Sequence, residues 1–324
     1  MTKAILINEA GGADKLIWTD IEVGDPGTSE IRIKQNACGL NYIDIYVRSG
    51  LYPIESYPAT IGMEAAGVIE AVGEGVTDFA VGDRVAYPMV LGGYAETRVM
   101  STAKVVKLPD GITDETAAAM MLKGLTAHYL LFRTYKVQPG DNILVYAAAG
   151  GVGLILCQWA KILGATVIGC VGNEEKAALA QANGCDHPIL YRDENIPARV
   201  KELTNGEGVS VAYDSIGKAT FMDSLDSLKP FGTLATYGNA SGKVEPFDPG
   251  ILAPRGSLYV TRPTLGTHTA TRELLTEGTD RLFATVQSGD VKISINQTYA
   301  LSDARQAHED LEARKTTGST VFTI

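Results

Sequence analysis

The chain has 324 residues, which exceeds the length of one typical domain and indicates two. Its 28 basic and 38 acidic residues give a net charge of −10, which disfavours nucleic acid and anionic membranes as partners. The N-terminus lacks the charged and apolar regions of a signal peptide, and no segment approaches the roughly 18 consecutive apolar residues of a membrane span. We therefore expect a cytoplasmic protein whose four scattered cysteines are reduced.

The first third of the chain predicts short antiparallel β-strands. Apolar and β-branched runs at 30–37, 66–72 and 84–87 are bounded by Gly, Pro and Asp, which is typical of a barrel-like domain. Between residues 114 and 131, Ala, Leu and Met dominate and predict a helix, with a break expected at Gly124.

From residue 142 the pattern alternates between strands and helices. The expected strands are 142–148, 165–171, 186–191, 209–214, 232–237 and 257–261, and the expected helices are 151–163, 176–183, 197–204 and 220–228. Alternating units of this length predict a parallel, doubly wound α/β sheet.

The chain after Pro263 is too short to form another domain. It predicts a helix at 271–288, a short strand, a helix at 304–314 and a final strand at 320–324. We expect this tail to pack on the N-terminal region. The expected domains are then a mainly β catalytic domain, 1–124 plus 263–324, and a Rossmann domain, 125–262, inserted into it.

The central motif is NILVYAAAGGVG at 142–153, in which an apolar strand runs directly into a glycine-rich turn and a helix. A dinucleotide needs this arrangement, because Gly150, Gly151, Val152 and Gly153 permit a tight turn and a close approach of the diphosphate. The N-terminus of the following helix then supplies N–H groups and a positive dipole end. The motif opens a full series of strand–helix units, so it predicts dinucleotide binding rather than a plain turn.

The end of the second strand of the sheet bears on the choice between NADP and NAD. An acidic residue there grips the ribose hydroxyls of NAD. This chain has the uncharged Gly172 and Asn173, with Lys176 one turn into the next helix, which favours a 2′-phosphate and hence NADP. Glu174 and Glu175 would repel that phosphate if they faced it.

Several short motifs together carry a resemblance to a known family. They are CGLNYID (38–44), RSGLY (48–52), GMEAAG (62–67), VGDRV (81–85), KGLT (123–126), AAAGGVG (147–153), YDS (213–215) and GN (238–239). The sequence resembles the zinc-independent quinone oxidoreductases of the medium-chain dehydrogenase/reductase superfamily, the group that includes the zeta-crystallins. The resemblance covers essentially the whole chain, and it implies a GroES-like catalytic domain and NADPH as cofactor.

The resemblance also implies roles for particular residues. Around the nicotinamide it places Asn41, Tyr42, Ile43, Asp44 and Tyr46, with Thr126 and Tyr129 opposite. It places the glycine-rich loop, Gly150 to Gly153, at the diphosphate, and Gly172, Asn173, Lys176 and Tyr191 at the adenosine phosphate. The rest of the site would be lined by Ser215, Asn239, Ser241 and Gly242, and closed by Arg314 in the last helix.

Departures from the zinc-dependent members of the same superfamily predict that no metal is bound. Those enzymes hold a catalytic zinc on Cys-Gly-x-Cys and Gly-His-Glu motifs, whereas this chain has Asn41 and Met63 at two of the ligand positions. Cys38 alone cannot hold zinc, which needs three or four ligands. The four histidines, His128, His187, His268 and His308, have no metal-ligand spacing, and we expect them to be structural.

Without a Lewis acid, reduction of an electrophilic acceptor is favoured over oxidation of an alcohol. We therefore expect NADPH-dependent quinone reduction, with the protein orienting the reactants and donating hydrogen bonds to the oxyanion that forms. The candidate catalytic residues are Asn41, Asp44, Tyr46, Tyr52 and Lys123. An aromatic wall is an equally good interpretation of the two tyrosines.

Two other functions fit the same scaffold. One is reduction of the C=C bond of α,β-unsaturated carbonyls, which differs from quinone reduction only in pocket shape. The other is a binding role, as in zeta-crystallins that bind RNA, which the net charge disfavours. The apolar strand expected at 257–261 ends the sheet, and relatives pair this edge, so we also expect a homodimer.

Overall fold

A computed structural model describes all residues from 1 to 324, and the chain forms two compact units. The first contains Met1–Leu125, Thr269–Gln287 and Ile293–Ile324, and the second contains Thr126–His268 and Ser288–Lys292. The second unit thus includes 263–268 and 288–292, which the sequence analysis assigned to the first domain. None of the helices is both long enough and apolar enough to span a bilayer.

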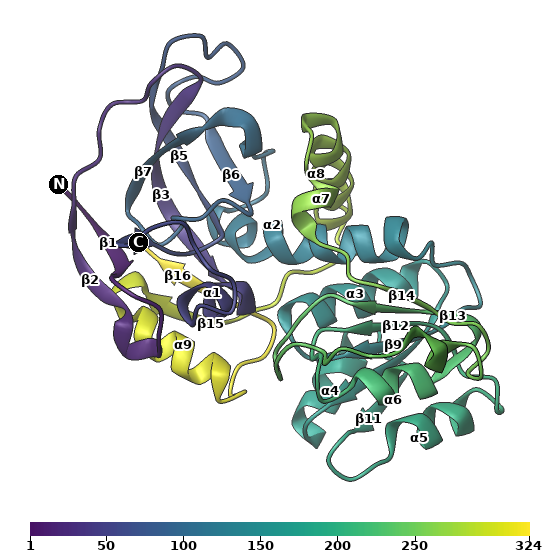
Figure 1. Cartoon of the computed structure of the whole chain (residues 1–324). Coiled ribbons are helices and arrows are strands. Elements are labelled where there is room, and N and C mark those ends of the chain that lie inside the picture. The colour runs from purple at the N-terminus through teal and green to yellow at the C-terminus, as the bar shows by residue number, and fades with distance from the viewer. The chain divides into compact units, whose positions relative to one another are not determined.

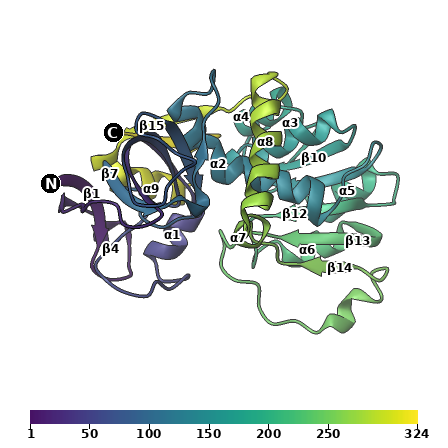
Figure 2. The same ribbon diagram turned by 90° about the horizontal axis from the view of Figure 1, so that it is seen from above.

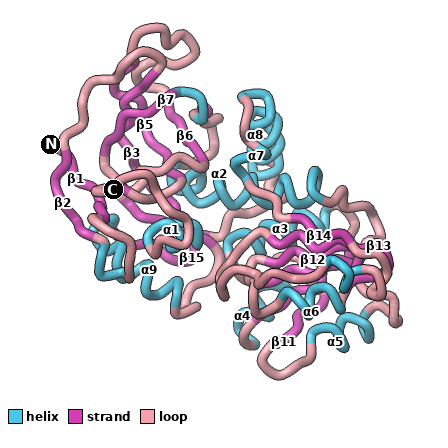
Figure 3. The backbone as a smooth tube through the Cα atoms, viewed as in Figure 1, coloured by secondary structure: helices cyan, strands magenta, loops and turns pink.

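The first unit is built on two sheets whose strands are connected mostly by loops (Figure 3). The smaller sheet has the order β2 (Ile17–Ile21), β1 (Thr2–Ile7) and β4 (Ala59–Thr60). The larger has the order β15 (Ile295–Ala300), β16 (Ser319–Thr323), β3 (Glu30–Leu40), β5 (Glu64–Val72), β6 (Arg84–Pro88) and β8 (Val106–Lys107), and β7 (Thr97–Ser101) also pairs with β3. All pairs are antiparallel except β15 with β16.

The C-terminal tail packs on the N-terminal region, as predicted. Strand β16 pairs with β3, with Val321 opposite Gly39 and Phe322 opposite Cys38. Phe322 is fully buried in a core that also contains Ile31 and Ile69. The tail therefore completes the core of the first unit, because an apolar strand this short has no core of its own to fill.

Four helices accompany these sheets: α1 (Tyr42–Arg48), α2 (Asp114–Tyr129), α8 (Arg272–Gln287) and α9 (Ala304–Glu312). The last four residues of α2 belong to the second unit. The predicted break at Gly124 is wrong, since α2 runs through it and ends in a π-helical turn, Leu130–Thr134. A Cβ atom on Gly124 would lie 2.6 Å from Leu282 Cδ1 of α8. The glycine therefore serves helix–helix packing, which outweighs its low helix propensity.

The second unit contains one parallel sheet of six strands, which confirms the predicted Rossmann fold (Figure 1). Its order is β11 (His187–Leu190), β10 (Thr166–Val171), β9 (Asn142–Tyr146), β12 (Val209–Asp214), β13 (Leu228–Thr236) and β14 (Tyr259–Thr261). The helices are α3 (Gly151–Ile162), α4 (Glu174–Ala182), α5 (Ile196–Leu203), α6 (Phe221–Asp226) and α7 (Leu265–His268). Helix α3 packs on β9 and β10, and α6 packs on β12 and β13.

Successive strands are added on one side of β9 as far as β11, and on its other side from β12 onward, so the order of strand addition reverses between β9 and β12. Ligands of such sheets bind outside the carboxyl ends of the strands at this reversal. The loop that follows β9 is the glycine-rich segment found in the sequence, so the topology places it where a ligand is expected.

Candidate functional site

The N-terminus of α3 is suited to binding an anion. Gly150 precedes the helix, and no side chain caps it. By contrast, Asn173 caps α4 and Asn195 caps α5 through their side-chain oxygens, at 2.9 and 3.0 Å from the accepted N–H nitrogens. The first N–H groups of α3 are therefore available to an anionic group such as a diphosphate.

Gly153 is the position where α3 touches the loop that follows β9. A Cβ atom there would lie 2.2 Å from the carbonyl oxygen of Ala147 and 2.8 Å from Cα of Ala148. Both contacts are with backbone, so no side-chain rotation can relieve them. The third glycine of the motif is thus required by close helix–strand packing.

The residues predicted at the adenosine phosphate come together where β10 and β11 end. A Cβ atom on Gly172 would lie 3.1 Å from the hydroxyl oxygen of Tyr191. Asn173 uses its side-chain oxygen to accept the N–H of Lys176, so that oxygen serves the helix cap. Lys176 is in the first turn of α4, as predicted.

The loop after β12 lies beside the loop after β13, and it is shaped by a buried carboxylate for which the motif YDS is the only sequence signal. Asp214 is fully buried at the end of β12, and it accepts four hydrogen bonds, from Ile216 N, Gly217 N, Thr220 Oγ1 and Ser224 Oγ, at 2.7 to 3.0 Å. An acidic residue closing an apolar strand, within the motif YDS, was the available signal. Its role is to shape the loop that carries Ser215.

The two loops also contact each other directly. Ser241 Oγ donates to the carbonyl of Ile216 at 2.8 Å and accepts the N–H of Ala219 at 3.0 Å. A Cβ atom on Gly238 would lie 2.2 Å from the carbonyl oxygen of Ser215. Ser241 therefore holds the wall of the predicted site together.

In the first unit, Glu64 brings two of the predicted catalytic residues together. Its Oε1 atom accepts from Lys123 Nζ and from Asn41 Nδ2, each at 2.8 Å, and its Oε2 atom accepts the N–H of Leu122 at 2.6 Å. Glu64 is 0% exposed and Lys123 is 5% exposed. The carboxylate thus neutralises the buried ammonium, and the motif GMEAAG is the only sequence signal that points to Glu64.

Asp44 is also fully buried, which distinguishes it from the other predicted catalytic residues. Its Oδ2 atom accepts the N–H of Asn41 at 2.8 Å and the hydroxyl of Tyr94 at 2.9 Å, and its Oδ1 atom has no hydrogen-bond partner. Burial raises the pKa of Asp44 to about 7. A side chain without exposed surface acts on a ligand through its charge or through neighbouring groups.

Three tyrosines form an aromatic cluster at α1. The ring centroids of Tyr42 and Tyr46 lie 6.2 Å apart, and those of Tyr46 and Tyr52 lie 5.2 Å apart, nearly edge to face. Tyr42 also donates its hydroxyl to the carbonyl of Leu311, at 3.2 Å. Tyr46 is only 7% exposed, which favours the aromatic-wall interpretation for this residue.

The remaining predicted residues have distinct surroundings. In the second unit Thr126 and Tyr129 are buried, and the ring of Tyr129 stacks on His268 with centroids 4.4 Å apart. The expectation that Arg314 lies in the last helix is wrong, because α9 ends at Glu312. Arg314 has a φ of 58°, the left-handed conformation that terminates helices.

Two of the positions that correspond to zinc ligands in other members of the superfamily, Cys38 and Asn41, form hydrogen bonds here. Asn41 donates to Glu64, and the thiol of Cys38 donates to the carbonyl of Gly93 at 2.6 Å. Burial raises the pKa of Cys38 well above its usual value. No three His, Cys, Asp or Glu side chains form a metal-binding group in the structure.

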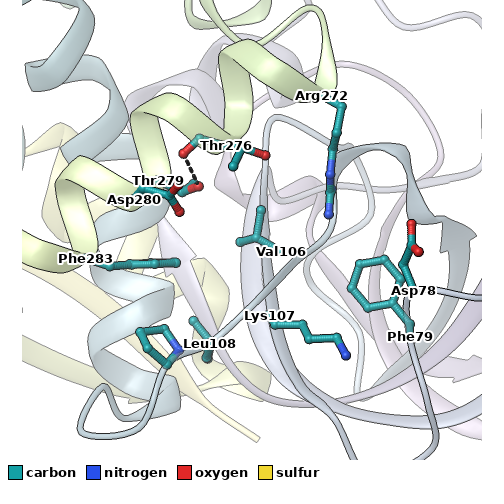
Figure 4. A pocket seen from close by; sticks show the side chains of 11 residues that line it. Asp78, Phe79, Val106, Lys107, Leu108, Arg272, Thr276, Thr279, Asp280 and Phe283 are labelled. Carbon is teal, nitrogen blue, oxygen red and sulfur yellow. Dashed lines mark hydrogen bonds between the residues drawn. The ribbon is translucent and has the colours of Figure 1, made fainter.

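A separate groove in the first unit lies between α8 and the segments around Phe79 and Lys107 (Figure 4). Phe79, Leu108 and Phe283 are largely buried in it, while Arg272 and Lys107 each lie 5.8 Å from the centroid of the Phe79 ring. None of the predicted site residues lines this groove.

Comparison with known proteins identifies the family. Residues 27–110 match the alcohol dehydrogenase GroES-like domain, and residues 151–279 match the zinc-binding dehydrogenase family. A quinone oxidoreductase of Pseudomonas aeruginosa is 52% identical over 323 residues, which cover 99% of each chain. The chain belongs to the quinone oxidoreductase family of the medium-chain dehydrogenases/reductases.

Two further members of the superfamily are informative. The crystal structure of Escherichia coli quinone oxidoreductase complexed with NADPH superimposes with a TM-score of 0.97 at 45% identity, covering 99% of this chain and 100% of that one. A 2-haloacrylate reductase of Burkholderia is 44% identical over 332 residues, covering 99% of each chain. The proteins similar to this chain therefore include reductases named for two different acceptors, quinones and 2-haloacrylates.

Proposed function

We propose that this protein reduces quinones with NADPH and without a metal. The observation that carries the proposal is the uncapped N-terminus of α3 at the strand reversal, which is suited to a dinucleotide diphosphate. The similar quinone oxidoreductases, and the NADPH complex of the one from E. coli, support the choice of cofactor and acceptor.

The residues present fit NADPH. We infer that the N–H groups of 151–153 hold the diphosphate, and that Gly172, Asn173, Lys176 and Tyr191 hold the adenosine phosphate. The nucleotide site would be completed by Ser215, Asn239, Ser241, Gly242, Thr126, Tyr129 and Arg314. We assign residues 41–46 of the first unit to the nicotinamide. When bound, NADPH supplies the hydride, and the chain supplies orientation and charge.

The chain's own groups would stabilise the negative charge that develops on the acceptor oxygen. Lys123 has three N–H donors, and one of them goes to Glu64. The ammonium is held in place by that bond, so it is preorganised to donate another N–H to an oxyanion. The tyrosine cluster at α1 supplies aromatic surface against which a flat acceptor can stack.

The acceptor is tested by comparing turnover of 1,4-benzoquinone with that of a 2-haloacrylate, with NADPH as donor in both assays. We expect faster turnover of the quinone, in a preparation that contains no stoichiometric zinc. The 44% identity to a 2-haloacrylate reductase specifically favours the alternative, reduction of a conjugated C=C bond. Faster turnover of the haloacrylate would establish that alternative.

The choice of NADPH over NADH is tested at Lys176. Replacing Lys176 with alanine removes a cation from the first turn of α4, the helix that follows β10, and we expect NADPH affinity to fall roughly tenfold. NADH affinity should not change, because NADH has no 2′-phosphate. Fluorescence titration measures both, with Lys136→Ala, an exposed lysine of the same unit, as the matched control. Unchanged NADPH affinity in Lys176→Ala would contradict the assignment.

We further propose a cytoplasmic homodimer. Strand β14 is the last strand of the sheet, and its Tyr259 is 61% exposed. Such an edge presents unpaired N–H and C=O groups, which a second copy can pair. We expect neither a nucleic acid nor a membrane among the partners, since the net charge is −10.

A further inference from the structure

A buried series of four side chains, which we call the Asp44 relay, joins α1 to α9 in the first unit. Arg48 NH1 lies 3.2 Å from His308 Nδ1, His308 Nε2 lies 3.2 Å from the Tyr94 hydroxyl, and that hydroxyl lies 2.9 Å from Asp44 Oδ2. None of the four residues is more than 2% exposed. Figure 1 and Figure 2 both show α1 beside α9.

The chemistry of these groups determines the direction of each hydrogen bond. Arg48 has no acceptor, so it donates to Nδ1 of His308. The proton of the neutral imidazole is then on Nε2, which donates to the oxygen of Tyr94. The hydroxyl hydrogen of Tyr94 remains for Asp44, which also accepts the N–H of Asn41. Every donor in the relay points toward Asp44 and favours its carboxylate form.

Each of the other buried charges near Asp44 has a charged partner. On β5 and α2, Glu64 binds Lys123 at 2.8 Å inside the core, and the buried Arg48 of α1 binds Glu312 of α9, which is 41% exposed, at 2.8 Å. Asp44 is therefore the unbalanced charge of this cluster when it is ionised. Glu64 raises its pKa and Lys123 lowers it, but both effects are smaller than that of burial.

The remaining titratable groups around Asp44 stay neutral near pH 7. Burial and Arg48 lower the pKa of His308 to about 3. Burial raises the pKa values of Tyr94 and of the Cys38 thiol on β3 well above their usual ranges. A change of charge in this cluster near neutral pH is thus a change at Asp44, whose Oδ1 atom is open to a proton.

We propose that Asp44 is the negative charge that favours the oxidised nicotinamide over the reduced one, and that Tyr94, His308 and Arg48 are positioning residues that keep it ionised. The inference rests on the proposed function, in which residues 41–46 border the nicotinamide. The nicotinamide ring is neutral in NADPH and positive in NADP⁺. A fixed carboxylate in a region of low dielectric stabilises that positive charge without touching the ring.

The test is binding of NADPH and of NADP⁺ to the full-length protein without any acceptor, across about pH 5.5 to 9, on either side of the Asp44 transition. We expect the preference for NADP⁺, measured as Kd(NADPH)/Kd(NADP⁺), to rise roughly fivefold as Asp44 ionises. The rise should be centred near pH 7, because the pKa of Asp44 is about 7. The phosphate groups are common to both ligands, so their titration cancels in the ratio.

Two variants distinguish a charge effect from a structural one. In Asp44→Asn the ratio should be low and independent of pH. In Tyr94→Phe the rise should persist but move to higher pH by about one unit, because the carboxylate loses a hydrogen-bond donor. Asp25→Asn, which alters a carboxylate that is 95% exposed in the same unit, should reproduce the wild-type curve. Circular dichroism checks that each variant is folded.

Several outcomes would overturn the inference. One is a wild-type pH dependence in Asp44→Asn, and another is an unchanged midpoint in a folded Tyr94→Phe. A wild-type curve with the expected rise, in a protein that does not reduce quinones, would leave this inference standing and refute only the proposed acceptor. Absence of binding by either nucleotide would refute the proposed function, and this inference with it.

Discussion

Replacing Lys123 with methionine is expected to destabilise the first unit by about 3–5 kcal/mol. The substitution keeps the length of the side chain but leaves Glu64 as a fully buried carboxylate without its cation. Asn41 and Leu122 still donate to that carboxylate, but neither carries a charge. Denaturant unfolding followed by circular dichroism measures the loss, and quinone turnover should fall with it, because Lys123 is also the proposed donor to the acceptor.

A second substitution separates loss of the cation from loss of packing. In Lys123→Met with Glu64→Gln, the uncompensated charge is gone, and we expect most of the stability to return while turnover stays low. The matched control is Lys3→Met at the exposed pair Lys3–Asp20, whose 2.7 Å separation is similar and whose side chains are 40% and 53% exposed. That change should cost at most about 1 kcal/mol. Equal losses at the two sites would contradict the argument.

Replacing Gly153 with alanine is expected to weaken NADPH binding by roughly tenfold to a hundredfold and to destabilise the second unit by about 1–3 kcal/mol. The added Cβ would lie 2.2 Å from the carbonyl oxygen of Ala147, so α3 and the loop must move apart. That movement displaces the N–H groups proposed to hold the diphosphate. Fluorescence titration with NADPH and thermal unfolding measure the two effects.

The control for this substitution is another glycine of the second unit. Gly266 has no neighbouring atom closer than 4.0 Å to the position of an added Cβ and has an ordinary φ, so Gly266→Ala should behave like the wild type. A Gly153→Ala protein that binds NADPH with wild-type affinity would show that the loop tolerates the displacement. The assignment of the diphosphate to this helix would then be wrong.

Much of the second unit is predictable because its signals are local. A strand, a turn and a helix N-terminus that are contiguous in the chain make up the glycine-rich loop, so residues 142–153 contain the whole element. Alternating strands and helices likewise reveal a parallel sheet without knowledge of which strands pair. The predicted bounds differ from the structure by a few residues, as at β13, which begins at Leu228 rather than at 232.

The errors occur where distant segments meet. The sequence predicts a helix break at Gly124, but Leu282 of α8, far away in the chain, packs against this position and makes a glycine necessary. The end of α9 is a local exception: the helix stops at Glu312 because Arg314 adopts a left-handed conformation that the sequence does not mark. The burial of His308 agrees with the structural role predicted for it, but only the fold shows that it connects Arg48 to Tyr94.

A dinucleotide site on a doubly wound sheet, and the resemblance to the quinone oxidoreductases, can be predicted from the sequence alone, because motif and periodicity are properties of neighbouring residues. The polar groups that are buried together become apparent only in the folded structure. Glu64 with Lys123, and Asp44 with Tyr94, come from segments tens of residues apart. Burial and pairing set the charge of such groups, and neither exists until the strands and helices that carry them have packed.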